Sequence, residues 1–328
     1  MVRGLIVVAV LAAVACAPPP TTQAAPPAVP EAAAAPPAPL SLPPPPPLTI
    51  DCAGAFAQGG VVVCRTQPGA VLVIDGEERG AADADGWVVA GFDRDAQPAA
   101  TVAVRTPTQS AVLDVSVAAR DYSVSRVNGL PPQTVTPSAP EVLARIARES
   151  AAKEEARKSR AGAHGFLQNF AWPVQGIMSS PWGSQRILNG EPRAPHYGID
   201  IAAPEGTPIR APADGVIAMA NPDMHFEGGL VMIDHGQGLI SYYLHMSRLD
   251  VVAGQTVTQG QLIGAVGKKG RATGPHLCWR MRWRDRNLDP ALAVQALATA
   301  RTHFANGALL DAGAAPPNYT PWSPAPTP

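Results

Sequence analysis

The stretch His196-Tyr197-Gly198-Ile199-Asp200-Ile201 opens the part of the chain that decides its fold. Side chains of a β-strand point alternately to two faces, and polar and apolar residues alternate in this stretch. His196 and Asp200 therefore share one face, whereas Ile199 and Ile201 share the other. The pattern predicts a strand with an apolar face toward a core and a second face that carries an imidazole and a carboxylate.

A second stretch, Gly274-Pro275-His276-Leu277-Cys278-Trp279, has the same alternation and places His276 and Cys278 on one face. Between the two stretches, ISYYLHMS ends another strand-like run with His245. Imidazole, carboxylate and thiolate are all zinc ligands. The His-x3-Asp spacing alone has two explanations, a metal site and a structural hydrogen bond between the imidazole and the carboxylate.

The residues around these stretches predict a β domain. Between about residues 166 and 290, apolar runs alternate with turn sequences such as Pro204-Glu205-Gly206-Thr207. The segments 206–216 and 254–264 echo each other and predict a duplicated hairpin motif. His235, in a tight turn, is expected to be structural.

The residues before this domain form two further segments. Short β-branched runs and Gly or Asp turns between about residues 49 and 128 are typical of a small β-sandwich. Glu141 to Arg160 has opposite charges four residues apart, such as Glu149 and Lys153, which predicts a solvated spacer helix, with a partner-binding helix as the alternative. We therefore expect an all-β protein: a C-terminal antiparallel β domain with a duplicated hairpin motif, preceded by a small β-sandwich-like domain and a spacer helix.

Four ordered motifs between about residues 172 and 290 resemble the lysostaphin-type zinc metallopeptidases, which are peptidoglycan endopeptidases. The motifs are HYGIDIAAPEGTPIRAPADG, IDHGQGLISYYLHMS, VVAGQTVTQGQLIGAVG and GPHLCW. The resemblance implies that His196 and Asp200 are zinc ligands and that His245 and His276 are catalytic. It assigns the third zinc ligand to position 278, where the family pattern has His and this chain has Cys278.

Cys278 in place of a histidine keeps a zinc donor but changes the charge of the site. Zinc accepts thiolate at about 2.3 Å, and a thiolate lowers the formal charge of the metal and its ligands by one unit. A bound water then becomes less acidic. The alternatives are that Cys278 is a small core residue, or that the domain keeps its groove and has lost turnover.

The resemblance implies hydrolysis of peptidoglycan cross-links with Zn²⁺ as cofactor. The main alternative is a degenerate member of the same family that binds peptidoglycan or activates a separate cell-wall hydrolase as its partner. A biotinyl- or lipoyl-like carrier is a weaker alternative, because such a carrier needs a Lys at a hairpin tip and Lys268-Lys269 matches this poorly. The net charge of −1 and the interspersed signs argue against nucleic acid as a partner.

The N-terminus predicts export to the cell envelope or periplasm. Arg3 precedes an apolar run of the length of a secretory signal, too short to span a bilayer. The run ends in LAAVAC, which resembles a lipoprotein signal with Cys16 as the lipidated residue and membrane anchor. Ordinary cleavage after Ala13-Val14-Ala15 is the alternative. In an oxidising compartment, Cys52 and Cys64 are expected to form a disulfide.

These observations predict six segments: an export signal with a lipoprotein cleavage site (1–16), a Pro/Ala-rich tether (17–48), a β-sandwich-like accessory domain (49–129), a Pro-rich linker and charged helix (130–163), a peptidase-like β domain (164–295) and a C-terminal tail (296–328).

Overall fold

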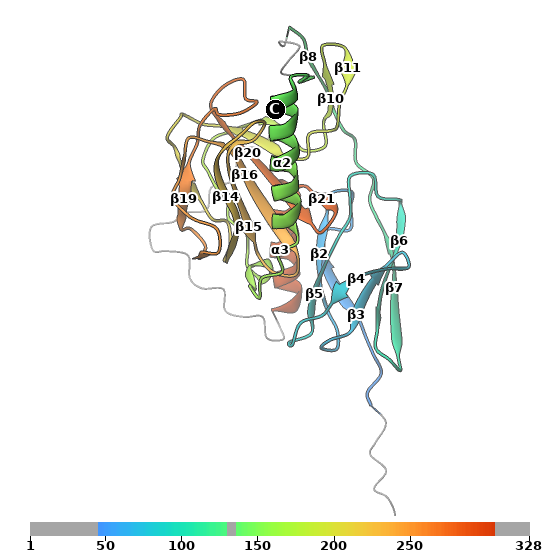
Figure 1. Ribbon diagram of the computed structural model, residues 1–328. Helices are drawn as coiled ribbons and strands as arrows, with labels where there is room; N and C mark the ends of the chain where they lie inside the picture. Colours follow the sequence, from blue (N-terminus) through green and yellow to red (C-terminus); the bar gives the residue numbers. More distant parts are fainter. Residues whose placement is uncertain (1–44, 130–135, 306–328) are drawn as a thin grey trace, which may run out of the picture. The chain divides into compact units, whose positions relative to one another are not determined.

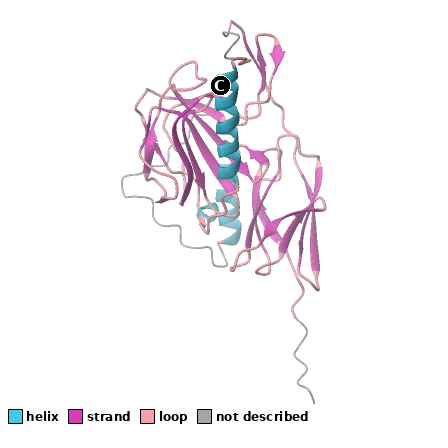
Figure 2. Cartoon of the chain, viewed as in Figure 1, coloured by secondary structure: helices cyan, strands magenta, loops and turns pink. Residues whose placement is uncertain are grey.

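The computed structural model describes residues 45–129 and 136–305 (Figure 1). Cys16, the export signal and most of the predicted tether and tail lie outside the described residues. From Pro46 on, the described residues form one compact unit. Strands dominate, and the described part of the chain holds two α-helices, α2 (Pro140–Arg157) and α3 (Pro290–Phe304) (Figure 2). The predicted all-β fold class is therefore confirmed. Neither described helix is long and apolar enough to cross a membrane.

Two small antiparallel sheets form the N-terminal part of this unit. One has the order β1-β2-β5 and the other β4-β3-β6-β7. Cys52 of β1 lies opposite Cys64 of β2, and the two are joined in a disulfide. The strands are β1 (Asp51–Gly54), β2 (Val61–Arg65), β3 (Val71–Ile74), β4 (Glu77–Ala81), β5 (Trp87–Gly91), β6 (Ala99–Arg105) and β7 (Ser110–Ser116).

The C-terminal part is built on an antiparallel sheet of eight strands. Its order is β18-β14-β15-β16-β20-β12-β9, and β21 pairs with β20. These strands are β9 (Ile177–Ser180), β12 (Ile199–Ala202), β14 (Gly215–Met224), β15 (Gly228–Asp234), β16 (Leu239–Met246), β18 (Thr256–Val257), β20 (His276–Trp283) and β21 (Arg286–Leu288). The central strands β15, β16 and β20 are the most deeply buried, because both faces of the sheet are covered.

The two hairpins that echo each other in the sequence pair with each other. Strand β13 (Pro208–Arg210) pairs with β19 (Leu262–Ala265), and β14 pairs with β18. Strand β17 (Arg248–Leu249) completes the small sheet β13-β19-β17. Each strand of one copy of the duplicated motif therefore pairs with a strand of the other copy.

A fourth small sheet joins the N-terminal and C-terminal parts. Strand β8 (Val124–Val127) pairs in parallel with β10 (Gln185–Leu188), which pairs with β11 (Glu191–Pro192). The strand β8 follows directly on the N-terminal sheets, and β10 leads to the segment that carries His196. Residues far apart in the sequence therefore build one wall beside the sheet.

The two faces of the large sheet carry different residues. Ile199, Ile201 and Trp279 belong to the main hydrophobic core. Cys278 lies on the other face in a smaller apolar cluster, against which Ala156 of α2 packs. The period-two alternation of the sequence therefore separates the core from the face that carries Cys278.

The spacer helix α2 has no buried residue of its own, yet it contacts the β domain. Arg145 pairs with Asp223 at 3.1 Å, and Lys153 forms an ion pair with Glu227. The sequence assigned Lys153 to a partner within the helix. A carboxylate on the facing β domain takes its place.

The C-terminal helix α3 continues to Phe304, beyond residue 295, where the sequence places the start of the tail. Asp289 caps it: its side chain accepts hydrogen bonds from the backbone N–H groups of Ala291 and Leu292. Pro290 at the first helical position suits a helix start. The domain boundaries predicted from the sequence otherwise stay predictions.

His235 is a buried structural residue whose titration couples pH to stability. Its Nδ1 donates to the carbonyl oxygen of Asp214 at 2.8 Å, and Nε2 lies 2.7 Å from the Ser241 hydroxyl. Burial lowers the pKa of His235 to about 4, against an ordinary value of about 6.5. The unfolded chain therefore binds a proton between these values that the folded protein does not take up.

We expect the contribution of His235 to the free energy of unfolding to fall by about 3 kcal/mol as the pH drops from about 6.5 to about 4. Chemical denaturation of the protein and of His235→Gln across this range measures it. The variant is less stable at pH 7 but has a shallower pH slope. The other buried histidines titrate in both proteins, so parallel slopes would contradict the assignment to His235.

Candidate metal centre

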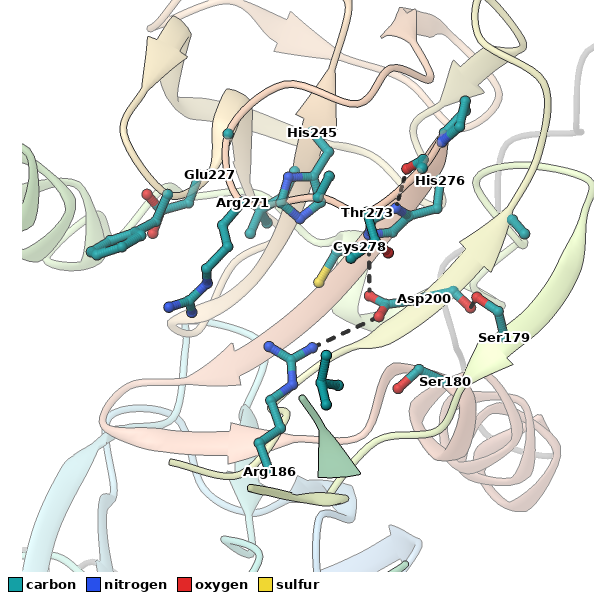
Figure 3. Close-up of a pocket in the computed structure, with 18 of the residues that line it drawn as sticks. Ser179, Ser180, Arg186, Asp200, Glu227, His245, Arg271, Thr273, His276 and Cys278 are labelled. Atoms are coloured by element: carbon teal, nitrogen blue, oxygen red, sulfur yellow. Dashed lines mark hydrogen bonds and ion pairs between the residues drawn. The ribbon is translucent and has the colours of Figure 1, made fainter. Parts of the chain in front are cut away.

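His196, Asp200 and Cys278 lie together at one face of the large sheet. Figure 3 shows Asp200 and Cys278 among the residues that line the pocket there. One donor atom from each lies within 4.8 Å of the others. The His196 Nε2 atom is 3.2 Å from Asp200 Oδ1 and 3.3 Å from Cys278 Sγ. The structure thus brings together the three residues that the sequence assigned to a metal.

Strand pairing places two of these three residues. Strands β12 and β20 are antiparallel, and their register sets Asp200 directly opposite Cys278. Gly198 allows the close approach: a Cβ there would lie 2.7 Å from Arg280 Cγ and 3.1 Å from Cys278 Sγ. A larger residue at position 198 would therefore push the two segments apart.

The sequence pattern predicts that His196 lies on a strand, but in the structure it lies before the strand. Strand β12 begins only at Ile199, so His196 lies in the preceding loop. Its backbone N–H donates to the Ser184 carbonyl at 2.8 Å, and its carbonyl accepts from Gly183 at 2.8 Å. The side chain is buried, with Nδ1 3.1 Å from the Ser180 hydroxyl. The loop, rather than strand alternation, aims Nε2 at Asp200.

The two remaining predicted residues, His245 and His276, lie side by side at the same site. Their ring centroids are 4.7 Å apart. The Nδ1 of His245 donates to the Lys269 carbonyl at 2.8 Å, and that of His276 to the Gly274 carbonyl at 2.8 Å. These bonds fix both tautomers, because a carbonyl can only accept. Each imidazole therefore keeps Nε2 free for chemistry.

The orientation of both imidazoles toward the site has local causes. The Nε2 of His276 is 3.7 Å from Asp200 Oδ1. His245 has φ of 65°, a left-handed conformation that is uncommon for a residue with a side chain. Its N–H donates to the Glu227 carbonyl at 2.7 Å. Such a conformation persists where surrounding bonds hold it, and it gathers at functional sites.

Charge and burial set the protonation of the site. Burial acts to raise the pKa of Asp200, but the adjacent His196 imidazole and the charges of His276 and Arg186 outweigh it and hold the pKa well below its usual range. Burial lowers the pKa of His196 despite the neighbouring Asp200. Burial and His276 together lower the pKa of His245 to about 4. At neutral pH the site therefore offers an ionised carboxylate and neutral imidazoles at positions 196 and 245.

The Cys278 thiol differs from the other donors. Burial raises its pKa to about 12. The thiolate therefore forms only where a nearby positive charge stabilises it. A coordinating metal deprotonates a thiol outright. Arg280 adds a second positive charge, because its Nε donates to Cys278 Sγ at 3.4 Å.

The donor set fits zinc on an observation independent of any resemblance. With the His196 Nδ1 proton donated to Ser180, the Nε2 lone pair faces Asp200. The Oδ1 atom of Asp200 is buried without a hydrogen-bond donor among the described residues. A nitrogen lone pair, an oxygen lone pair and a sulfur atom that converge in this way can bind a cation. Nitrogen, oxygen and sulfur are the donor atoms that bind zinc in proteins.

A cavity of about 750 Å³ is lined by two of the three donors, Asp200 and Cys278, and by His245 and His276. One wall is the loop 270–275, and the opposite wall includes Ser125 and Val127 of β8 and Arg186 of β10. Glu227 lines the end nearest to α2. The site therefore lies in a cleft with room for an extended peptide.

Sequence reasoning missed Ser180, Arg186 and Arg280. Arg280 carried a signal, because on a strand it shares a face with His276 and Cys278. Ser180 and Arg186 carried none. They come from segments before the first motif, and only the tertiary fold brings them to the site.

Comparison with known proteins identifies the fold around this site. The model of peptidase family M23 matches residues 194–290. The peptidoglycan DD-endopeptidase ShyA of Vibrio cholerae is 43% identical over 103 residues, which cover 31% of this chain and 23% of ShyA. The cell division protein DipM of Caulobacter vibrioides is 35% identical over 131 residues, which cover 38% of this chain and 21% of DipM. The chain thus spans less than a quarter of the length of either relative.

A solved structure matches over a larger share of both chains. A crystal structure described as a peptidase M23 from Pseudomonas aeruginosa is 32% identical, with a TM-score of 0.58. The match covers 74% of this chain and 97% of that one. It extends well beyond the motifs, so the likeness is one of fold as well as of site. The chain belongs to peptidase family M23, the lysostaphin-type peptidases.

Proposed function

We propose that the protein is a zinc-dependent endopeptidase that hydrolyses peptide cross-links of peptidoglycan. The observation that carries this proposal is the convergence of His196, Asp200 and Cys278 beside the free Nε2 atoms of His245 and His276. Relatives named peptidoglycan DD-endopeptidases support the substrate class.

In this proposal His196, Asp200 and Cys278 hold the zinc ion. When bound, zinc supplies Lewis acidity toward the scissile carbonyl oxygen. The low pKa of His245 leaves its Nε2 lone pair available at neutral pH to take a proton from the attacking water. When His276 is protonated on both ring nitrogens, its Nε2, on the Asp200 side, can donate a hydrogen bond to the oxygen on which negative charge develops.

We further propose export to the cell envelope, with lipidation of Cys16 as the membrane anchor. The disulfide between Cys52 and Cys64 supports an oxidising compartment. A Pro/Ala-rich tether of residues 17–48 would then give the cleft reach toward the wall.

A second function, binding of peptidoglycan without turnover or activation of a partner hydrolase, is favoured by one observation. The Cys278 thiolate lowers the positive charge of the site, which weakens the activation of water. The Arg280 guanidinium next to Cys278 Sγ offsets this loss in part. Activity is therefore the measurement that separates the two functions.

The test uses the full chain, because β8 contributes to the cleft wall. We expect purified protein to hold about one zinc per chain and to release new free peptide ends from peptidoglycan sacculi. Removal of zinc by a chelator abolishes the release, and added zinc restores it. Folded, zinc-loaded protein that binds sacculi but releases no ends would support the binding function instead.

A further inference from the structure

Three arginines from separate segments line the cleft around the metal donors. They are Arg186 of β10, Arg271 of the loop 270–275 and Arg280 of β20. Figure 3 shows Arg186 and Arg271 reaching from opposite sides toward the same space. A guanidinium stays charged at all relevant pH values. The cleft therefore carries a concentration of positive charge, of which the proposed chemistry uses only Arg280.

The partners of these arginines leave that charge largely uncompensated. The nearest anion to Arg186 is Asp200, at 3.8 Å between Nη2 and Oδ2, and Asp200 is also a proposed zinc ligand. Arg271 stacks on the Phe226 ring, 4.8 Å from its centroid, and forms no ion pair with a residue that the structure describes. Arg280 directs its Nε to Cys278.

The carboxylates of the cleft are already engaged. Glu227 forms an ion pair with Lys153 of α2, and Asp200 faces His196 and His276. Glu227 offsets the charge of Arg271 only in part, since it forms no ion pair with it among the described residues. Burial lowers the pKa of Arg271, and the like charges of Arg186 and Arg280 lower it further. An external anion in this space would relieve that repulsion.

We propose that Arg186 and Arg271 bind a free carboxylate of the peptide substrate. This inference rests on the proposed function and deepens it. A planar guanidinium pairs with a carboxylate through two parallel N–H···O bonds, which suits recognition of this group. The protein thus selects cross-links that bear a carboxylate and discriminates against neutral bridges.

The position of Arg186 limits where on the substrate this carboxylate lies. Its guanidinium is 3.8 Å from Asp200 Oδ2, next to the proposed metal. An extended peptide advances about 3.3 to 3.6 Å per residue. A carboxylate bound by Arg186 therefore belongs to a residue next to the scissile bond or one position further.

The test compares two synthetic cross-linked peptides that differ in one group next to the scissile bond, a free carboxylate in one and a carboxamide in the other. The full-length, zinc-loaded protein is expected to cleave the carboxylate peptide with a kcat/KM about 10- to 100-fold higher, the range of a charge-assisted hydrogen bond. Arg186→Gln and Arg271→Gln each lower kcat/KM more for the carboxylate peptide than for the carboxamide peptide, so that the ratio of the two values falls.

Arg248→Gln is the matched control, because Arg248 is exposed, pairs with Asp250 and lies outside the cleft lining. It is expected to keep the preference of the unmodified protein. A merely structural role of Arg186 or Arg271 would lower the cleavage of both peptides equally. That result would overturn the inference.

Failure of this inference and failure of the proposed function give different results. Equal cleavage of both peptides by the unmodified protein would overturn the inference and leave the peptidase function intact. If neither peptide is cleaved, the peptidase function fails, and calorimetry of the same peptides decides the inference. Tighter binding of the carboxylate peptide that Arg186→Gln and Arg271→Gln abolish would support it, and equal binding would overturn it.

Discussion

Asp200→Ala is expected to remove the bound zinc and to lower peptidoglycan hydrolysis to background. The substitution deletes the one carboxylate among the three donors and leaves His196 and Cys278 without their shared neighbour. Loss of a residue that only orients a ligand costs about 10- to 100-fold in metal affinity, so loss of a ligand itself costs more. Zinc content by atomic emission and peptide release from sacculi measure both effects.

Two control variants make the Asp200 result specific. Asp223→Ala removes an exposed aspartate that pairs with Arg145 and is expected to change neither zinc content nor hydrolysis. Ser180→Ala removes the hydroxyl next to His196 Nδ1 and is expected to weaken zinc by about 10- to 100-fold. Full zinc content and full activity in a folded Asp200→Ala protein would remove Asp200 from the site.

His245→Ala is expected to lower kcat by about 10² to 10⁴-fold while zinc content stays unchanged. His245 is not one of the three donors, and its Nε2 is the proposed acceptor of the proton from water. A lower kcat with full zinc content indicates loss of proton transfer, whereas a loss of zinc indicates loss of a ligand. Single-turnover hydrolysis of a cross-linked peptide, with zinc measured on the same sample, gives both quantities.

His303→Ala is the matched control for this prediction, because His303 is exposed and pairs with Asp51 at 3.0 Å, outside the cleft lining. It is expected to keep full activity. A His245→Ala protein that retains its kcat would exclude the proton-transfer role. One that loses its zinc would make His245 part of the metal site.

Much of the site could be predicted because its key residues lie on or beside strands of period two. The alternation along β20 puts His276 and Cys278 on one face, and Leu277 and Trp279 on the opposite face lie in the core. His196 was predicted to lie on the strand itself, but the strand starts three residues later. The backbone hydrogen bonds of His196 in its loop and the close contacts at Gly198 determine where the strand begins. The alternation of polar and apolar residues along one strand carries no information about either.

The rest of the cleft could not be predicted because non-local pairing builds it. Arg186 reaches the site through the parallel pairing of β10 with β8, strands more than fifty residues apart. Lys153 pairs with Glu227 and not with its expected partner within α2, because Glu227 lies in the turn between β14 and β15, close to the helix. The helix α3 did have a local signal. Asp289 followed by Pro290 is a typical helix start.

The proposed metal site depends on Cys278 as a ligand, because this residue separates the chain from the His pattern of its family. Replacement of zinc by Co²⁺ in the full chain tests this ligand most directly, since a thiolate bound to Co²⁺ gives an intense near-ultraviolet charge-transfer band. We expect this band in the unmodified protein and its loss in Cys278→Ser. Stoichiometric Co²⁺ without the band, or a band that persists in Cys278→Ser, would contradict it.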